Sequence, residues 1–495
     1  MKRRDYRPLL EPMDGLEGTT SPDHKRRMLW LFTFFIITFV ILAGRLAMLH
    51  LSPGDLLKQE NAFHDLEMQV RENRGEIFDR NGVVLATNRP VPSLEVDPRL
   101  VWTDKENPQN DKSNQLADYL SQKLNIPRNE VYEDLTNVGT KEKPRRSNVI
   151  KRHIENLTDT DFAEIMKMGV LCSKQADDAY DAVKAKIEGR ATAEDLKKLK
   201  KISIQNALIR TNETLRTYPH GDTAAHLLGY VQYTGEAMDG IESAYNQYLA
   251  CQPGVIQTRV DNNRRVLSSG TTGYSAPKGG DLLQLTIDLN IQRNLEAALD
   301  QRMQETEAKA AMGIIMDPHT GAILAMATRP AFDPNNYNKF EPAVRKNKAI
   351  IDVFEPGSVF KLVTASAALE NKLVTTETMI DCEGGYFNPY GHRIKDYHKM
   401  GVEPFHTCFA MSSNIALIKV GAMLGPERLE DWIRRFGFGE KTAPDFSKES
   451  RGLFRTRKYW SKLTMGSLPM GQEISVTMPQ LARAYSVIAN GGILV

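Results

Sequence analysis

Cysteine is scarce in this chain of 495 residues, which contains only Cys172, Cys251, Cys382 and Cys408. None of them forms a Cys-x-x-C pair, and no histidine stands at metal-ligand spacing, so neither a zinc site nor a dense disulfide framework is indicated. The sequence therefore predicts no metal and no cofactor. A bond between Cys382 and Cys408 would need an oxidising compartment, and nothing in the sequence fixes the distance between them. The alternative is four buried or free thiols.

The chain also lacks a strong excess of charge of either sign. Its 64 Lys and Arg residues against 62 Asp and Glu residues leave a formal net charge of +2. No tract of Lys and Arg interleaved with aromatic residues follows residue 49, so the sequence predicts no nucleic-acid partner. A composition of 41% hydrophobic and 25% charged residues is typical of globular protein. The length allows about three domains of roughly 150 residues each.

One stretch is long and apolar enough to cross a membrane. Residues 28–49 contain a single charged side chain, Arg45, which lies near the end and can reach the lipid headgroups. No A-x-A cleavage site and no lipoprotein cysteine follow, which favours an anchor over a cleaved signal peptide. A buried core helix is the other alternative. Basic residues at 25–27 precede the stretch, and the positive-inside rule predicts a cytoplasmic arm over residues 1–27 with the remainder exported across the inner membrane.

The part between the membrane stretch and residue 270 has the pattern of a β-rich module. Residues 71–88 predict a hairpin, because an Asp-Arg-Asn-Gly turn at 79–82 divides two apolar runs. Residues 255–260 and 266–267 flank a polar turn and predict another strand pair. Residues 101–210 are polar and helix-rich, and the charged segment near 173–201 predicts a solvated helical insertion. We interpret residues 50–270 as one irregular, β-rich module, to which the resemblance described below gives the role of an elongated pedestal.

A compact α+β domain is predicted from residue 271 onward. Residues 282–287 predict a strand, and Asp288 is placed to cap the helix that follows. Residues 311–316 and 322–327 are apolar runs joined by turn residues at 317–321, which predicts a buried antiparallel hairpin. A helix, an antiparallel hairpin and further helices together indicate an α+β fold.

A Ser-x-x-Lys pattern marks the first candidate catalytic residues. Residues 355–361 read EPGSVFK, and the Pro and Gly are placed to begin a helix just before Ser358. A helix amino terminus offers backbone N–H groups to a developing oxyanion. Lys361 lies one turn further on among apolar neighbours, and desolvation would favour its neutral, basic form. The bare pattern is also common as a capping serine with a solvated lysine, so the surrounding sequence must decide between a catalytic and a structural role.

The context is a Ser-x-Asn pattern about 50 residues later. Ser412 and Asn414 are two residues apart, which lets their side chains point the same way from a turn or a short extended segment. A second hydroxyl can relay a proton, and an amide can both accept from and donate to a peptide backbone. Alone, this pattern is a common turn. After Ser-x-x-Lys and in this order, it predicts a catalytic constellation of Ser358, Lys361, Ser412 and Asn414.

The chain resembles the class B penicillin-binding proteins, monofunctional transpeptidases of cell-wall synthesis, over nearly all residues after Met28. Besides the two patterns above, the matching motifs are residues 74–82 (RGEIFDRNG), 216–221 (RTYPHG), 240–242 (GIE), 285–288 (LTID), 317–326 (DPHTGAILAM) and 332–335 (FDPN). The resemblance implies that Ser358 is acylated, that Lys361 is the base, that Ser412 relays a proton and that Asn414 binds the substrate backbone.

The resemblance also implies an architecture and a set of partners. We expect a single transmembrane helix over residues 28–49, a dimerisation-type pedestal, and then a transpeptidase domain like those of penicillin-binding proteins and serine β-lactamases. The expected partners are peptidoglycan stem peptides, β-lactams as covalent inhibitors, a glycosyltransferase and other divisome membrane proteins. The short cytoplasmic arm and residues 412–416, 436–439 and 471–477 look more like division (septal) enzymes than elongation enzymes.

The third motif of the family, Lys-[Thr/Ser]-Gly on a strand, is not found. Residues 441–443 read KTA, but they follow Asn414 too closely, precede a proline in a predicted loop and lack the glycine. We interpret them as a decoy. The family continues beyond the position of residue 495 into the strands that carry the motif. We therefore expect the domain over residues 271–495 to be incomplete and the chain as given to acylate poorly or not at all.

Three hypotheses of function follow from the sequence. The leading one is a penicillin-sensitive D,D-transpeptidase that cross-links stem peptides through an acyl-enzyme on Ser358. A second is a D,D-carboxypeptidase or β-lactamase, in which water replaces the amine acceptor. A third is a non-catalytic scaffold or β-lactam sensor in which Ser358 is acylated without turnover.

Overall fold

The computed structural model describes residues 22–51, 65–70, 72–103, 111–140, 145, 147–173, isolated residues between 183 and 193, 206–260, 266–391, 393–442, 445–446 and 448–495. Most of the predicted charged insertion near 173–201 lies outside these described residues. The chain divides into two compact units, Met1–Val70 with Pro253–Pro277, and Arg71–Gln252 with Lys278–Val495. The domain boundaries predicted from the sequence stay predictions.

The first unit contains one long apolar helix. Helix α1 spans Pro22–Leu51, and within it Arg26–Met48 has a mean hydropathy of 2.2 with no part of that window buried. Large apolar side chains such as Trp30 and Phe39 are exposed along it. By length and composition the helix can cross a bilayer, at the place where the sequence predicts the anchor. The exposure of residues 26–48 argues against the alternative of a buried core helix.

The first unit also contains a three-stranded antiparallel sheet. Its strands are β1 (Asp65–Val70), β8 (Gly254–Val260) and β9 (Val266–Ser275), in the order β1-β8-β9. The pairing of β8 with β9 confirms the strand pair predicted on either side of a polar turn.

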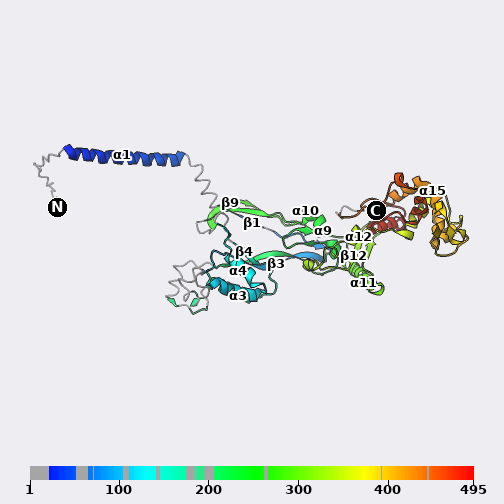
Figure 1. Cartoon of the computed structure of the whole chain (residues 1–495), viewed down its shortest axis with the longest axis horizontal. Helices are drawn as coiled ribbons and strands as arrows, with labels where there is room; N and C mark the ends of the chain where they lie inside the picture. The colour runs from blue at the N-terminus through cyan, green and yellow to red at the C-terminus, as the bar shows by residue number, and fades with distance from the viewer. Residues whose placement is uncertain are drawn as a thin grey trace, which may run out of the picture. The chain divides into compact units, whose positions relative to one another are not determined.

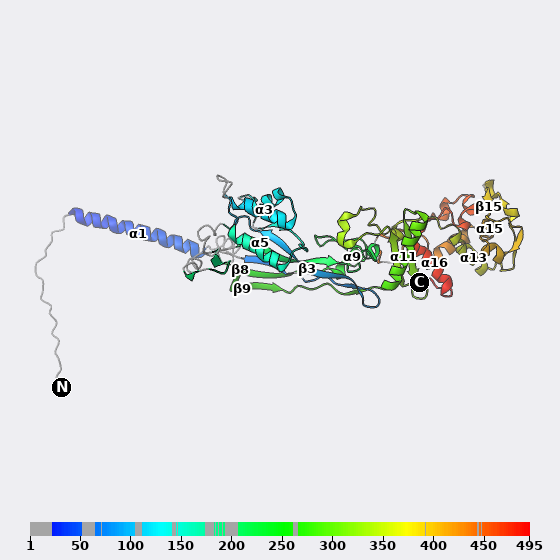
Figure 2. The same ribbon diagram turned by 90° about the horizontal axis from the view of Figure 1, so that it is seen from below.

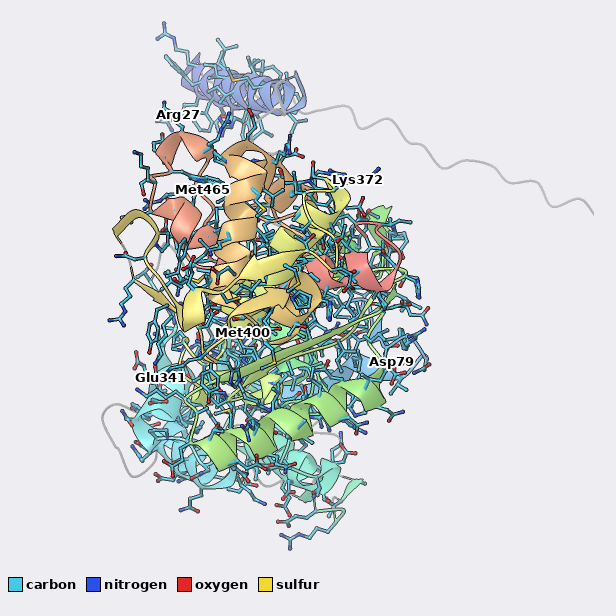
Figure 3. The ribbon with its side chains drawn as sticks, turned by 90° about the vertical axis from the view of Figure 1, so that its right-hand side faces the viewer. Arg27, Asp79, Glu341, Lys372, Met400 and Met465 are labelled. Carbon is cyan, nitrogen blue, oxygen red and sulfur yellow. The ribbon has the colours of Figure 1, made fainter. Side chains whose placement is uncertain are left out.

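The second unit begins with a five-stranded sheet. Strands β10 (Leu283–Gln284), β2 (Ile77–Phe78), β3 (Val84–Val96) and β4 (Asn148–Lys151) follow one another, and β5 (Leu208–Thr217) pairs with β3. Strands β2 and β3 form the predicted antiparallel hairpin. The carboxylate of Asp79, labelled in Figure 3, fixes the turn by accepting from the backbone N–H groups of Asn81 and Val83, each at 2.8 Å. Strand β10 is shorter than the predicted strand over residues 282–287.

Three helices cover this sheet on one side. They are α3 (Lys112–Leu124), α4 (Arg128–Thr136) and α5 (Asp159–Leu171), and Figure 1 shows α3 and α4 beside β3 and β4. Their buried faces share one core with the strands, including Leu94, Leu120 and Phe162. The helix-rich character predicted for this part of the chain is confirmed.

A buried ionic cluster joins three of the family-like motifs. Glu242 has no exposed surface, and its carboxylate accepts from Arg74 Nε at 2.7 Å and from Arg216 Nε at 2.7 Å. The hydroxyl of Tyr218 donates to the same carboxylate at 3.2 Å. The buried carboxylate is thus paired with one buried guanidinium, Arg216, and one partly buried guanidinium, Arg74, so these motifs form part of the structural core of the second unit.

The hairpin predicted in the catalytic region is present. Strands β11 (Ala311–Met316) and β12 (Ile323–Arg329) pair antiparallel. Helix α11 (Leu289–Thr306) precedes them and is capped by Asp288, whose side chain accepts from the N–H groups of Asn290 and Ile291, as the sequence predicts. Both α11 and α16 (Met478–Ala489) contact β11, and they lie together in Figure 2.

The remaining part of the second unit is mainly helical. Helices α13 (Lys361–Glu370) and α15 (Asn414–Arg435) pack against each other, and a short helix α14 (Phe405–Ala410) precedes α15. Two small antiparallel pairs lie in the connection from α13 to α14: β13 (Met379–Asp381) with β16 (Val402–Pro404), and β14 (Tyr386–Phe387) with β15 (Ile394–Lys395). The α+β class predicted from the sequence is confirmed.

Candidate active site

Ser358 lies in a tight turn at the start of α13. Residues Gly357–Phe360 form a 3-10 helix, η3, that continues into α13 at Lys361. The turn exposes Ser358 and buries Phe360 completely. The sequence predicts an α-helical amino terminus at this point, and the first turn is instead the narrower 3-10 form that is frequent at helix ends.

The loop that ends at Gly471 packs against this turn and accepts a hydrogen bond from it. The backbone N–H of Gly357 donates to the carbonyl of Gly471 at 2.9 Å. A Cβ atom at Gly471 would lie 2.1 Å from the Gly357 carbonyl oxygen, and Gly471 has a φ of +88°. Only glycine fits this close approach. On another side, the hydroxyl of Tyr485 from α16 donates to the carbonyl of Val359 at 3.0 Å.

Lys361 connects the two sequence patterns. Its side chain is buried, with 2% of its surface exposed. Its Nζ lies 2.7 Å from the carbonyl oxygen of Ser412, 3.0 Å from Ser412 Oγ and 2.7 Å from Asn414 Oδ1. The Ser-x-x-Lys and Ser-x-Asn residues, which are about 50 positions apart in the chain, therefore meet at one amine. The common orientation predicted for Ser412 and Asn414 is confirmed.

The surroundings of Lys361 shift its titration toward the neutral form. Burial lowers the pKa of Lys361 to about 8, against an opposing attraction from the Asp396 carboxylate. The predicted desolvation of this lysine is thus confirmed. A neutral amine has two N–H donors and one lone pair. Two of its three partners are carbonyl oxygens that can only accept, and the third is the Ser412 hydroxyl, which can donate to the lone pair.

The Ser-x-Asn turn is held by the amino terminus of α15. Ser412 has a φ of +55°, a left-handed conformation uncommon for serine. Ser413 is the N-cap, and its Oγ accepts from the N–H of Ala416 at 3.0 Å. Asn414 Nδ2 donates to the carbonyl of Lys395 at 3.0 Å. The amide of Asn414 is therefore fixed in orientation, with its oxygen toward Lys361.

Asp396 is a site residue that sequence reasoning missed. It is buried, and its carboxylate accepts from Ser413 Oγ at 2.6 Å, from the N–H of Asn414 at 2.6 Å and from the N–H of Ile415 at 3.1 Å. A carboxylate is stabilised by the positive end of a helix dipole in this position. No local pattern around residue 396 signals this role, because the partners are 17 to 19 positions away.

Two cysteines lie next to the Ser-x-Asn turn and contact Ser413. Cys382 and Cys408 are both fully buried free thiols whose Sγ atoms are 3.6 Å apart. Ser413 Oγ also approaches Cys382 Sγ at 3.5 Å. Among the residues that the structure describes, no group of three His, Cys, Asp or Glu side chains forms a candidate metal site.

Lys441 and Thr442 of the Lys-Thr-Ala stretch do not lie on a strand. Thr442 is in a bend, and its N–H and hydroxyl donate to the carboxylate of Glu449 at 2.8 and 2.6 Å. Ala443 is outside the described residues. The position of Thr442 agrees with the interpretation of this stretch as a decoy.

Two family models match the chain. The penicillin-binding protein dimerisation domain matches residues 69–285, and the penicillin binding protein transpeptidase domain matches residues 311–495. Similar curated proteins include stage V sporulation protein D of Bacillus subtilis, 28% identical over 95% of this chain and 66% of the relative. They also include peptidoglycan D,D-transpeptidase FtsI of Escherichia coli, 27% identical over 95% of this chain and 72% of the relative. The chain thus spans about two thirds to three quarters of the length of these relatives.

Solved structures show the same fold. A peptidoglycan synthetase from Bifidobacterium adolescentis aligns with a TM-score of 0.60 at 20% identity, over 86% of this chain and 73% of that chain. Penicillin binding protein 2X from Streptococcus thermophilus aligns with a TM-score of 0.59 at 22% identity, over 87% of this chain and 60% of that chain. At these identities the likeness supports the fold.

Proposed function

Because the chain belongs to the class B penicillin-binding proteins, we propose that it is a peptidoglycan D,D-transpeptidase with Ser358 as its nucleophile. The observation that carries the proposal is the meeting of Lys361 with Ser412 and Asn414, one helical turn from an exposed serine. A serine hydroxyl is a weak nucleophile, and a desolvated lysine beside it supplies the base that acylation needs.

In the first half-reaction, neutral Lys361 takes the proton of the Ser358 hydroxyl. Ser358 Oγ then attacks the carbonyl of the penultimate D-Ala of a stem peptide, and backbone N–H donors at the start of the helix stabilise the oxyanion. The C–N bond to the terminal D-Ala breaks, and the leaving nitrogen takes back the proton through the Ser412 hydroxyl. The product is an ester between Ser358 and the shortened stem peptide.

In the second half-reaction, an amine of a neighbouring stem peptide attacks that ester. Lys361 and Ser412 remove the amine proton and return a proton to Ser358 Oγ, which restores the free enzyme and leaves an amide cross-link. Asn414 positions the substrate backbone at the rim of the site. β-Lactams acylate Ser358 by the first half-reaction, and one solved relative, the Mycobacterium penicillin binding protein 3, is described as a complex with aztreonam.

The test of this proposal distinguishes the acceptor. Membranes that carry the protein are incubated with a peptide ending in D-Ala-D-Ala, in water alone and with a D-amino acid as acceptor. A transpeptidase forms the new amide at the expense of hydrolysis as the amine concentration rises. Hydrolysis at an unchanged rate would support the carboxypeptidase alternative. Acylation with neither product would support the scaffold or sensor alternative.

The titration of Lys361 predicts the pH dependence of acylation. Its pKa is about 8, so the neutral, basic fraction is small at pH 6, half at about pH 8 and nearly complete at pH 10. We expect the rate of β-lactam acylation to rise with pH through a single ascending limb centred near 8. Stopped-flow or quenched labelling from pH 6 to 10 measures it. A rate that is flat across this range would exclude Lys361 as the titrating base.

We propose that α1 anchors the protein in the inner membrane with the second unit outside the cytoplasm. The basic residues before the apolar stretch support this orientation. A phosphatase reporter fused after Leu51 should be active, and a reporter that is active only in the cytoplasm would reverse the orientation.

We also propose a role in septal wall synthesis beside a glycosyltransferase and other divisome membrane proteins. The septal-type motifs at residues 412–416 and 471–477 support it by resemblance. Depletion of the protein should block division and yield filaments of normal width. Round or widened cells would indicate the elongation machinery.

A further inference from the structure

Cys382 and Cys408 are the closest approach of two thiols among the described residues. They are 26 positions apart in the chain, and their Sγ atoms are 3.6 Å apart. Neither side chain has any exposed surface. Cys382 follows strand β13, and Cys408 lies in helix α14, so the pair belongs to two different elements.

Backbone hydrogen bonds already hold the two segments that carry Cys382 and Cys408 next to each other. Strand β13 pairs with β16, and α14 begins directly after β16. The N–H of Cys382 donates to the carbonyl of Gly401 at 2.8 Å. A covalent bond between the two sulfur atoms would therefore join segments that hydrogen bonds hold side by side in any case, and it would require little movement of the chain.

The thiol pair supports the catalytic turn. The carbonyl of Cys408 accepts from the N–H of Ser413 at 2.9 Å. Ser413 Oγ lies 3.5 Å from Cys382 Sγ and donates to Asp396 at 2.6 Å. Ser413 stands between Ser412 and Asn414, the two residues whose side chains bind Lys361. A disulfide bond would fix the positions of Cys382 and Cys408, the two residues that Ser413 contacts.

We infer that Cys382 and Cys408 form a disulfide bond in the exported protein. The inference rests on the proposed orientation, which places the second unit in an oxidising compartment. The oxidant is a protein disulfide of a thiol-disulfide oxidoreductase. The thiolate of one cysteine attacks it and forms a mixed disulfide; the thiolate of the other displaces the donor, which leaves as a dithiol carrying the two electrons. Both cysteine thiols lose their protons.

Burial determines when the bond can form. Burial and the hydrogen bond that the Cys408 thiol donates to Cys382 raise the pKa of the Cys408 thiol to about 12. The reactive thiolate is therefore scarce once the protein has folded, and neither sulfur is accessible to the disulfide of the oxidoreductase. The bond forms during folding after export, before α14 packs, and it is afterwards shielded from reductants.

Peptide mapping of the natural protein tests the inference. Membranes are treated with a thiol-alkylating reagent under denaturing, non-reducing conditions, and the digested protein is analysed by mass spectrometry. We expect a peptide containing Cys382 linked to one containing Cys408, two hydrogen atoms lighter than the sum of the two. Cys172 and Cys251, for which we infer no disulfide, should carry the alkyl group and serve as internal controls. Alkylation of Cys382 and Cys408 to the same extent as the controls would overturn the inference.

Thermal denaturation gives an independent readout. A disulfide that closes a loop of this length stabilises mainly by restricting the unfolded chain. Refolding the protein with dithiothreitol should lower its Tm by roughly 5 °C or more, whereas a Cys382→Ser/Cys408→Ser variant should melt at the same temperature with and without the reductant. The same shift in both proteins would contradict the bond.

The two proposals fail separately. If a β-lactam labels Ser358 but both thiols are alkylated, the inferred disulfide is wrong and the proposed function stands. If the disulfide is found but no β-lactam labels the protein, the proposed function is wrong and the inferred disulfide stands.

Discussion

Replacing Lys361 with methionine should lower the rate of acylation by a β-lactam by a factor on the order of 100 or more, the usual loss for a general base. Lys361 is buried and its amine is the point at which Ser412 and Asn414 meet. Methionine keeps the apolar stem and removes the amine. The measurement is the second-order rate constant of labelling by a fluorescent penicillin in membranes that carry each variant.

The thermal stability of this variant should change little. Removal of a buried amine relieves its desolvation, and because Ser412 is exposed and Asn414 is half-buried, we expect water to replace the lost donor. Lys372→Met is the matched control, because Lys372 is an exposed lysine just beyond α13 (Figure 3). Equal labelling rates of the two variants would contradict the role of Lys361. A parallel loss of Tm and labelling in Lys361→Met alone would make Lys361 structural.

Replacing Glu242 with alanine should destabilise the second unit by roughly 3–5 kcal/mol, the usual cost of removing one partner from a buried ionic cluster. Glu242 is fully buried, and its carboxylate compensates Arg74 and Arg216 while it accepts from Tyr218. Alanine leaves both guanidinium groups without their anion. The fall in Tm should reach about 10 °C or more at the usual sensitivity of a domain of this size.

Two further variants sharpen this prediction. Glu242→Gln keeps the shape and the acceptor oxygen but removes the charge, and it should fall between the wild type and Glu242→Ala. Glu236→Ala removes an exposed glutamate from a nearby turn and should melt like the wild type. Calorimetry compares the four proteins. A melting temperature of Glu242→Ala equal to that of Glu236→Ala would show that the cluster contributes nothing to stability.

Local patterns in the sequence were sufficient to predict several elements. The hairpin of β2 and β3 follows from an Asn-Gly turn, and the cap of α11 follows from Asp288 before a helical run. The hairpin of β11 and β12 follows from two apolar runs around a turn. These features depend on residues within a few positions of one another, where backbone sterics and short-range hydrogen bonds decide the outcome.

The features that the sequence did not predict depend on contacts between distant segments. Asp396 became part of the site only because the chain from β15 passes the amino terminus of α15. The motifs around Arg74, Arg216 and Glu242 were identified by resemblance, but their meeting at one carboxylate required the folded sheet. The 3-10 turn at Ser358 likewise depends on Gly471, more than 100 positions away along the chain. No periodicity or spacing encodes such contacts.

The most direct test of the account is the site of covalent labelling. Membranes from cells that make the natural protein, as distinct from the 495-residue chain as given, are treated with a penicillin; the protein is digested, and the acylated peptide is sequenced by mass spectrometry. We expect one adduct, on the Ser358 hydroxyl, which is lost in Ser358→Ala and retained in Ser366→Ala, a serine further along α13. An adduct on any other residue, or labelling that survives Ser358→Ala, would contradict it.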